Sequence, residues 1–390
     1  MRRASIVSAS ETSARNETPP LADLFPVSQR HLVLLASVIA VAYAVCFLIT
    51  VQYKDYWYAV LNSNDSLGYI AIARCLRSWD PKIVGQPMLF WGTGYATLAV
   101  SALTGGNYAA ALVVLSWVCC LLAVLFSYRL FGVGVAAWFV FIDPAMMSRS
   151  MLGGSEPLFV ALFLAALVAL RKRFIYWAVL LASLATTVRP IGICLVLAIL
   201  IGALWKKEWA RFGKGAAIAT VTGLIYCLPL LLLFGNPLAN FKGYSNDWYR
   251  SSLPISLPLF PIVQQAMVSL GTEPLSNTFR LGVWVLGVLF IIGYQGFFRG
   301  GLLQRWKVVP EETLGMVFVM LFCLSYNSSW AWPEFPRFIV PAVPFLLALI
   351  GTDRLYRKML WAAAPVCGAL GATYIVGIQQ VVQTIRAVTG

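Results

Sequence analysis

Residues 62–74 read Asn62-Ser63-Asn64-Asp65-Ser66-Leu67-Gly68-Tyr69-Ile70-Ala71-Ile72-Ala73-Arg74, a polar stretch that separates the first hydrophobic run from all the later ones. Asn64 or Asp65 can cap a helix by accepting a hydrogen bond from a free backbone N–H. Asp65, Tyr69 and Ile72 then share one stripe of that helix. The stretch therefore predicts a helix that opens with a carboxylate and has an aromatic and apolar face that can lie against a membrane. From this spacing alone, Asp65 is either a helix cap or a catalytic group.

The composition is that of a membrane protein. Hydrophobic residues make up 60% and charged residues 11% of the 390 residues, and no polar interval is long enough for a separate soluble domain. We expect a disordered cytoplasmic tail over residues 1–30 and one all-α polytopic membrane domain over residues 31–390. The net charge of +14 is spread over short loops, which is typical of topology signals. It favours anionic membrane lipids, and not nucleic acid, as partners.

About eleven membrane spans are predicted, together with one re-entrant or interfacial segment over residues 88–103. We treat that segment as non-spanning because a full span there would move the triplet Arg171-Lys172-Arg173 out of the cytoplasm. Asp65 and the external loops 52–107 and 235–280 then lie on the extracytoplasmic side. The predicted spans cover residues 32–51, 108–128, 133–147, 156–170, 174–188, 191–205, 215–234, 281–298, 314–326, 338–350 and 360–379.

Three more motifs fall on the predicted outer face. They read Ser155-Glu156-Pro157-Leu158-Phe159, Thr187-Val188-Arg189-Pro190-Ile191-Gly192 and Trp330-Ala331-Trp332-Pro333-Glu334-Phe335-Pro336-Arg337-Phe338. Glu156 can simply favour the dipole of a helix whose first position is Pro157. Arg189 at a membrane boundary is costly unless it reaches water or meets an anion, so a phosphate or a carboxylate is its expected partner.

These motifs, in this order, carry a family resemblance. The pattern Asp65-x-x-x-Tyr69-x-x-x-Ala73, the Ser-Glu-x-x-Phe motif at Glu156, the Arg-x-x-Gly motif at Arg189 and the segment that begins at Arg337 resemble the class C (GT-C) glycosyltransferases. Within that class the chain looks most like the GPI-type mannosyltransferases and their bacterial relatives. Asn64 stands where the first motif of that group has Trp.

The resemblance implies an enzyme of the bacterial inner membrane that moves a sugar, mannose or another hexose, from a polyprenyl-phosphate donor to a glycan, lipid or protein acceptor on the extracytoplasmic face. Such a reaction needs a base for the acceptor hydroxyl and a cation for the developing phosphate charge. We assign Asp65 as the base, with Glu156 positioning the acceptor or joining Asp65 around a divalent cation. The expected substrate-binding residues are Tyr69, Arg189, Arg337 and, on an external loop that can act as a lid, Trp248 and Tyr249.

Two other function classes stay open from the sequence. A transporter or lipid flippase would use Asp65, Glu156 and Arg189 as a substrate or proton relay, but the two halves of the chain show no matching pattern of broken hydrophobic runs. A lipid-linked polysaccharide polymerase or ligase would place essential basic and histidine residues in its large external loop, and loop 235–280 has no histidine. No cofactor or protein-bound metal is specifically predicted, because neither a CxxC spacing nor a histidine cluster is present.

Overall fold

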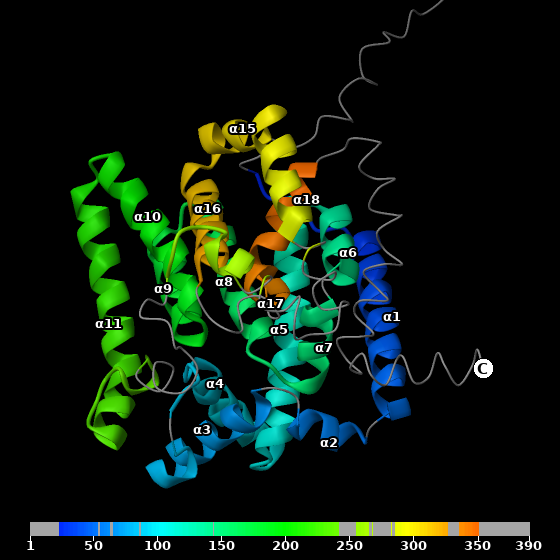
Figure 1. The fold of residues 1–390 in the computed structure, drawn as a ribbon, viewed down its shortest axis with the longest axis vertical. Helices are drawn as coiled ribbons and strands as arrows, with labels where there is room; N and C mark the ends of the chain where they lie inside the picture. The colour runs from blue at the N-terminus through cyan, green and yellow to red at the C-terminus, as the bar shows by residue number, and fades with distance from the viewer. Residues whose placement is uncertain are drawn as a thin grey trace, which may run out of the picture.

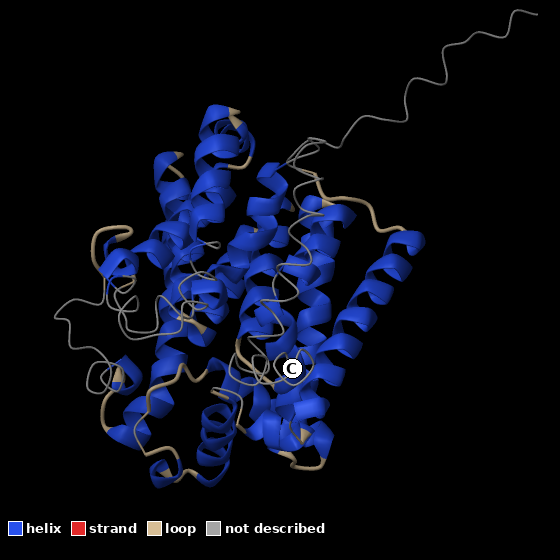
Figure 2. Cartoon of the chain, turned by 45° about the vertical axis from the view of Figure 1, so that its right-hand side comes forward, coloured by secondary structure: helices blue, strands red, loops and turns tan. Residues whose placement is uncertain are grey.

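The computed structural model describes residues 23–53, 55–62, 65–85, 87–142, 144–241, 255–264, 267, 282, 285–326 and 335–350. These residues are helical and contain no strand (Figure 2), apart from an isolated bridge between Ile255 and Tyr326. The all-α prediction is confirmed. The helices of the first half are α1 (Gln29–Tyr53), α2 (Tyr56–Leu61), α3 (Ser66–Ser78), η1 (Pro81–Ile83), α4 (Gly92–Ser101), η2 (Ala102–Thr104), α5 (Tyr108–Phe131), α6 (Val133–Ile142), α7 (Pro144–Leu152) and α8 (Glu156–Arg171).

The second half continues the bundle with helices of very different length. They are α9 (Ile175–Val188), η3 (Pro190–Gly192), α10 (Ile193–Trp205), α11 (Trp209–Phe234), η4 (Ile291–Phe298), α15 (Gly301–Val308), α16 (Pro310–Ser325), α17 (Phe335–Ile339), η5 (Val340–Ala342) and α18 (Val343–Ile350). In Figure 1, α1 and α11 stand on opposite sides of the bundle, α2, α3 and α4 gather at one end, and α15 lies at the other end.

Three helices, α1, α5 and α11, are each long and apolar enough to cross a bilayer, and two bent helix pairs raise this number to five if each pair is one span. One pair is Met146–Leu152 with Glu156–Arg171, bent by 119°; the other is Val285–Phe298 with Gly301–Val308, bent by 70°. Residues 133–147, predicted as one span, are divided between α6, which ends at Ile142, and α7, which begins at Pro144, so that span stays a prediction. The total of eleven stays a prediction, and the span over residues 360–379 lies outside the described residues.

The segment before α1 belongs to the folded structure from residue 23 onward. The backbone N–H of Phe25 donates to the carbonyl of Arg129 at 2.8 Å, and the N–H of Ser28 donates to the phenolic oxygen of Tyr128 at 3.1 Å. The predicted tail boundary at residue 30 is therefore too late, because these contacts tie the entry into α1 to the end of α5.

The apolar face of α3 packs inside the protein and does not lie against a membrane as we expected. Tyr69 and Ile72 are buried, and a Cβ placed on Gly94 of α4 would stand 2.3 Å from Cγ2 of Ile72. A side chain at residue 94 would therefore push α4 away from α3. With ten residues, or about 15 Å, α4 is too short to cross a hydrocarbon core of about 30 Å, which agrees with the non-spanning segment predicted there.

Helix α8 carries a buried charged cluster at each of its ends. At its C-terminal end, the Arg171 side chain donates from Nε and Nη2 to the two carboxylate oxygens of Glu312 at 2.7 and 2.8 Å, and from Nη1 to the carbonyl of Leu130 at 2.7 Å. Arg171, predicted as a topology signal, is thus also a structural ion pair, while Lys172 and Arg173 are exposed. At its N-terminal end, α8 begins with Glu156.

Candidate active site

The four charged residues that the motifs single out come together at the N-terminal end of α8, from four separate segments. Arg337 of α17 bridges two carboxylates: its Nη2 lies 3.0 Å from Oδ2 of Asp65, and its Nε donates to Oε1 of Glu156. Arg189, between α9 and η3, donates from Nη2 to the same oxygen of Glu156 at 2.6 Å. It also donates from Nε to the hydroxyl of Ser155 at 3.1 Å. We call these four charged residues the charged cluster.

Glu156 is the centre of the charged cluster and is sealed from solvent, with an exposed fraction of 0%. Its Oε1 accepts from two guanidinium groups, while its Oε2 is buried and has no hydrogen-bond partner among the described residues. The guanidinium of Arg149, itself 4% exposed, adds a third positive charge that acts on this carboxylate. A buried carboxylate needs such cations, because an unpaired charge in the interior is costly. Glu156 is therefore more than a favourable charge at a helix start.

Asp65 differs from Glu156 in its access to solvent. It occupies the N-cap position of α3, yet its side chain makes no capping hydrogen bond, so the capping interpretation is not supported. The carboxylate turns instead to Arg337, and 34% of the Asp65 side chain is exposed. Its Oδ1 makes no hydrogen bond among the described residues.

The bend between α7 and α8 sets the position of Glu156, and three neighbouring helices hold it. Gly153 has φ +80°, a left-handed conformation that favours glycine. The Ser66 hydroxyl of α3 donates to the carbonyl of Gly153, and the Tyr56 hydroxyl of α2 donates to the carbonyl of Met151 at 2.8 Å. Ser116 of α5 both donates to the carbonyl of Gly154 and accepts from its N–H, each at 3.2 Å. These bonds satisfy backbone groups that the break in the helix leaves unpaired.

Comparison with solved structures gives one significant match, the crystal structure of ArnT from Cupriavidus metallidurans in the apo state. The match has a TM-score of 0.51 and 16% sequence identity, and it covers 89% of this chain and 65% of that chain. The chain therefore has the fold of ArnT. With 65% of ArnT covered, the chain spans less than two thirds of that protein. At 16% sequence identity, the likeness establishes the fold alone. No protein-family model and no curated protein matches the sequence.

The charged cluster does not suit the divalent cation that the sequence left open between Asp65 and Glu156. The guanidinium of Arg337 bridges the two carboxylates, in the place where such a cation would stand. Within the described part of the chain, no group of three or more His, Cys, Asp or Glu residues lies close enough together to hold a metal ion. We therefore derive no step through a metal.

The other predicted site residues are not among the four residues of the charged cluster. Tyr69, one turn after Asp65, is 3% exposed and lies in a buried aromatic cluster with Trp91 and Tyr226. Trp248 and Tyr249 lie outside the described residues. Two further residues of the site were not assigned from the sequence. Ser155, within one motif, accepts from Arg189, and the charge of Arg149 acts on Glu156. Ser116 was missed altogether, since its only signal is a small polar residue within an apolar run.

The two hydrogen bonds of Ser116 make a testable prediction. Ser116→Ala leaves both backbone groups of Gly154 buried without a partner, which we expect to cost about 1–3 kcal/mol of stability. Ser127→Ala is the matched control on the same helix, because the Ser127 hydroxyl is buried without a hydrogen-bond partner among the described residues. Melting in detergent measures both variants. Equal melting temperatures for the two variants would show that Ser116 does not hold the bend.

Proposed function

We propose that this protein is an integral membrane glycosyltransferase of the bacterial inner membrane. It moves a sugar, mannose or another hexose, from a polyprenyl-phosphate donor to an acceptor on the extracytoplasmic face. The observation that carries this proposal is the charged cluster, in which an accessible carboxylate pairs with Arg337 and a buried carboxylate pairs with both Arg337 and Arg189. It lies on a fold shared with ArnT. ArnT, a membrane enzyme of this class, supports the proposal at the level of the fold.

Asp65 is the general base. The hydroxyl oxygen of the acceptor forms a bond to the anomeric carbon of the sugar, the bond from that carbon to the phosphate oxygen breaks, and the hydroxyl proton passes to the carboxylate. Arg337 fixes the orientation of the Asp65 carboxylate through Oδ2 and leaves Oδ1 to accept the proton. The lipid phosphate departs with the electron pair of the broken bond.

Arg189 and Arg337 stabilise the phosphate of the donor. Arg189 uses Nε and Nη2 for Ser155 and Glu156, while its Nη1 makes no hydrogen bond among the described residues. Because these two hydrogen bonds already fix the guanidinium, it can donate to a phosphate oxygen without losing further conformational freedom. Glu156 is a positioning residue in this account, because its buried carboxylate aligns both arginines and has no exposed surface for the acceptor.

Substitution of Arg189 tests the phosphate role. Arg189→Lys keeps a positive charge but loses the planar fork, so we expect it to fold and to bind a polyprenyl-phosphate mannose about tenfold more weakly, with Arg189→Ala weaker still. Arg211→Lys is the control, because Arg211 forms an exposed pair with Glu208 at 2.7 Å. Donor affinity and melting temperature are measured on the same preparations. Unchanged affinity with a lowered melting temperature would assign Arg189 to packing and remove it from the site.

A further inference from the structure

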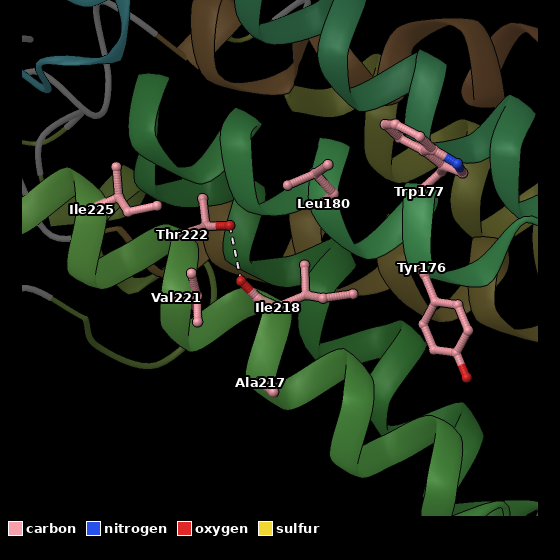
Figure 3. Close-up of a pocket in the computed structure, with 8 residues that line it drawn as sticks. All are labelled: Tyr176, Trp177, Leu180, Ala217, Ile218, Val221, Thr222 and Ile225. Carbon is pink, nitrogen blue, oxygen red and sulfur yellow. Dashed lines mark hydrogen bonds between the residues drawn. The ribbon is translucent and has the colours of Figure 1, made fainter.

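A long groove runs between α9 and α11, and Figure 3 shows the residues that line part of it. It consists of two cavities of about 460 and 310 Å³. Both are lined by Leu180, Thr222 and Ile225, so they are parts of one continuous groove. One end lies at Tyr176 and the other at Thr187.

The polar groups in the middle of the groove and at its Thr187 end are bonded within the protein, while the Tyr176 hydroxyl and the Trp177 indole lie at the other end. The Thr222 hydroxyl donates to the carbonyl of Ile218 at 2.9 Å, as the dashed line in Figure 3 shows. The Thr187 hydroxyl donates to the carbonyl of Leu184 at 2.7 Å, and at the same end the Tyr95 hydroxyl donates to a carbonyl of α11 at 3.1 Å. Because each of these hydroxyls is satisfied within the protein, the chemistry that fits the groove is a hydrocarbon chain.

The end of the groove at Thr187 and the nearby Arg189 of the charged cluster face different helices. Arg189 points toward α8, where it bonds Ser155 and Glu156. Thr187 instead meets α4, where a Cβ on Gly92 would stand 2.6 Å from the Thr187 hydroxyl oxygen. The groove and the charged cluster thus face different neighbours, so a ligand other than the sugar donor fits the groove better.

The opposite end of the groove is basic and aromatic. The ammonium of Lys214 lies 5.9 Å from the ring centre of Tyr176, and Trp177 is 62% exposed. Lys172 and Arg173, in the turn before α9, are exposed at the same end. Exposed aromatic rings beside lysines and arginines are typical of a membrane interface, and the excess of cations favours the cytoplasmic leaflet and its anionic lipids.

We infer that the groove binds one anionic phospholipid of the cytoplasmic leaflet, with its phosphate at Lys214 and one acyl chain between α9 and α11. The span from Tyr176 to Thr187 is about 16 Å along the helix axis, which is close to half of a hydrocarbon core of about 30 Å. The lipid fills the space between the two helices and supports α11. This site is independent of the glycosyltransferase proposal.

The test uses the full-length protein, purified in mild detergent and examined by native mass spectrometry with analysis of the extracted lipid. Ala217→Phe places a ring in the groove (Figure 3), whereas Thr220→Phe places the same ring on α11 at an exposed position outside the lining. We expect the wild type and Thr220→Phe to retain about one anionic phospholipid per chain and Ala217→Phe to lose it. Equal retention by the two variants, or a polyprenyl phosphate as the retained lipid, would overturn the inference.

A charge substitution gives a second readout that does not depend on the folding of Ala217→Phe. Lys214→Gln removes the cation at the mouth of the groove. We therefore expect the variant to prefer phosphatidylglycerol over phosphatidylcholine about fivefold less than the wild type does. The preference is derived from the melting temperatures after reconstitution into vesicles of each lipid. Lys307→Gln, at an exposed position of α15, is the control and should keep the wild-type preference. If both variants keep it, Lys214 holds no headgroup and the inference fails.

Discussion

Asp65→Asn is expected to lower the rate of sugar transfer by about 10²–10⁴-fold while folding and donor binding stay close to those of the wild type. The carboxamide keeps the size of the side chain and an oxygen that can accept from Arg337, but it cannot take the proton of the acceptor hydroxyl. Because the Asp65 side chain makes no capping hydrogen bond, its replacement has no cap to disturb. Single-turnover transfer and donor affinity, measured side by side, separate the chemical step from binding.

Asp55→Asn is the matched control for that experiment. Asp55 is a true helix cap, since its carboxylate accepts from the N–H of Tyr58 at 2.9 Å, and asparagine caps a helix equally well. Asp55 also precedes a helix, α2, which lies at the same end of the molecule as α3 (Figure 1). We expect this variant to keep the wild-type rate. If Asp65→Asn also keeps a near-normal rate, Asp65 is not the catalytic base.

Glu156→Ala is expected to destabilise the protein by about 3–5 kcal/mol, the usual effect of removing one partner from a buried ion pair. The substitution leaves Arg189 and Arg337, whose side chains are 11% and 10% exposed, without the carboxylate that both contact. Since α8 begins at Glu156, the loss also removes the ion pair that joins α8 to α17. Detergent melting of the purified variant measures the effect.

Two comparisons make the Glu156 result specific. Glu208→Ala removes a carboxylate from an exposed pair with Arg211, and we expect a cost within about 1 kcal/mol. The double variant Glu156→Gln with Arg189→Gln should be less destabilised than the sum of its single variants, because each single change strands the other charge. If Glu156→Ala melts like Glu208→Ala, Glu156 is not the centre of a buried cluster.

The sequence predicted the charged cluster better than it predicted the helices around it. Asp65, Glu156, Arg189 and Arg337 are charged residues next to long apolar runs, where a charge is costly without a partner, so each was visible as a candidate. Their order matched a family pattern, which indicated that they would meet. Which residue pairs with which, and that Arg337 touches both carboxylates, depends on tertiary packing that no local pattern encodes.

The errors in the fold have a common physical cause. The spans predicted over residues 133–147 and 156–170 placed a break before Glu156, but they did not predict helix α7 or its sharp bend to α8. Side chains from α2, α3 and α5, among them Ser116, hold that bend, and hydropathy does not reveal such contacts. In the same way, the apolar face of α3 meets Gly94 of α4, and in the sequence a face buried against protein resembles a face buried in lipid. Arg149 was overlooked because its burial beside Glu156 arises only when the bend forms.

The most direct test of the account is a transfer assay with purified full-length protein, a panel of radiolabelled polyprenyl-phosphate sugars and a membrane extract as the source of acceptor. The account predicts that, with at least one hexose donor, the wild type moves label from the lipid to an acceptor and releases polyprenyl phosphate. It also predicts that Asp65→Asn does neither while Asp55→Asn does both. Label transfer at the same rate by the wild type and Asp65→Asn, or no transfer from any donor in the panel, would contradict it.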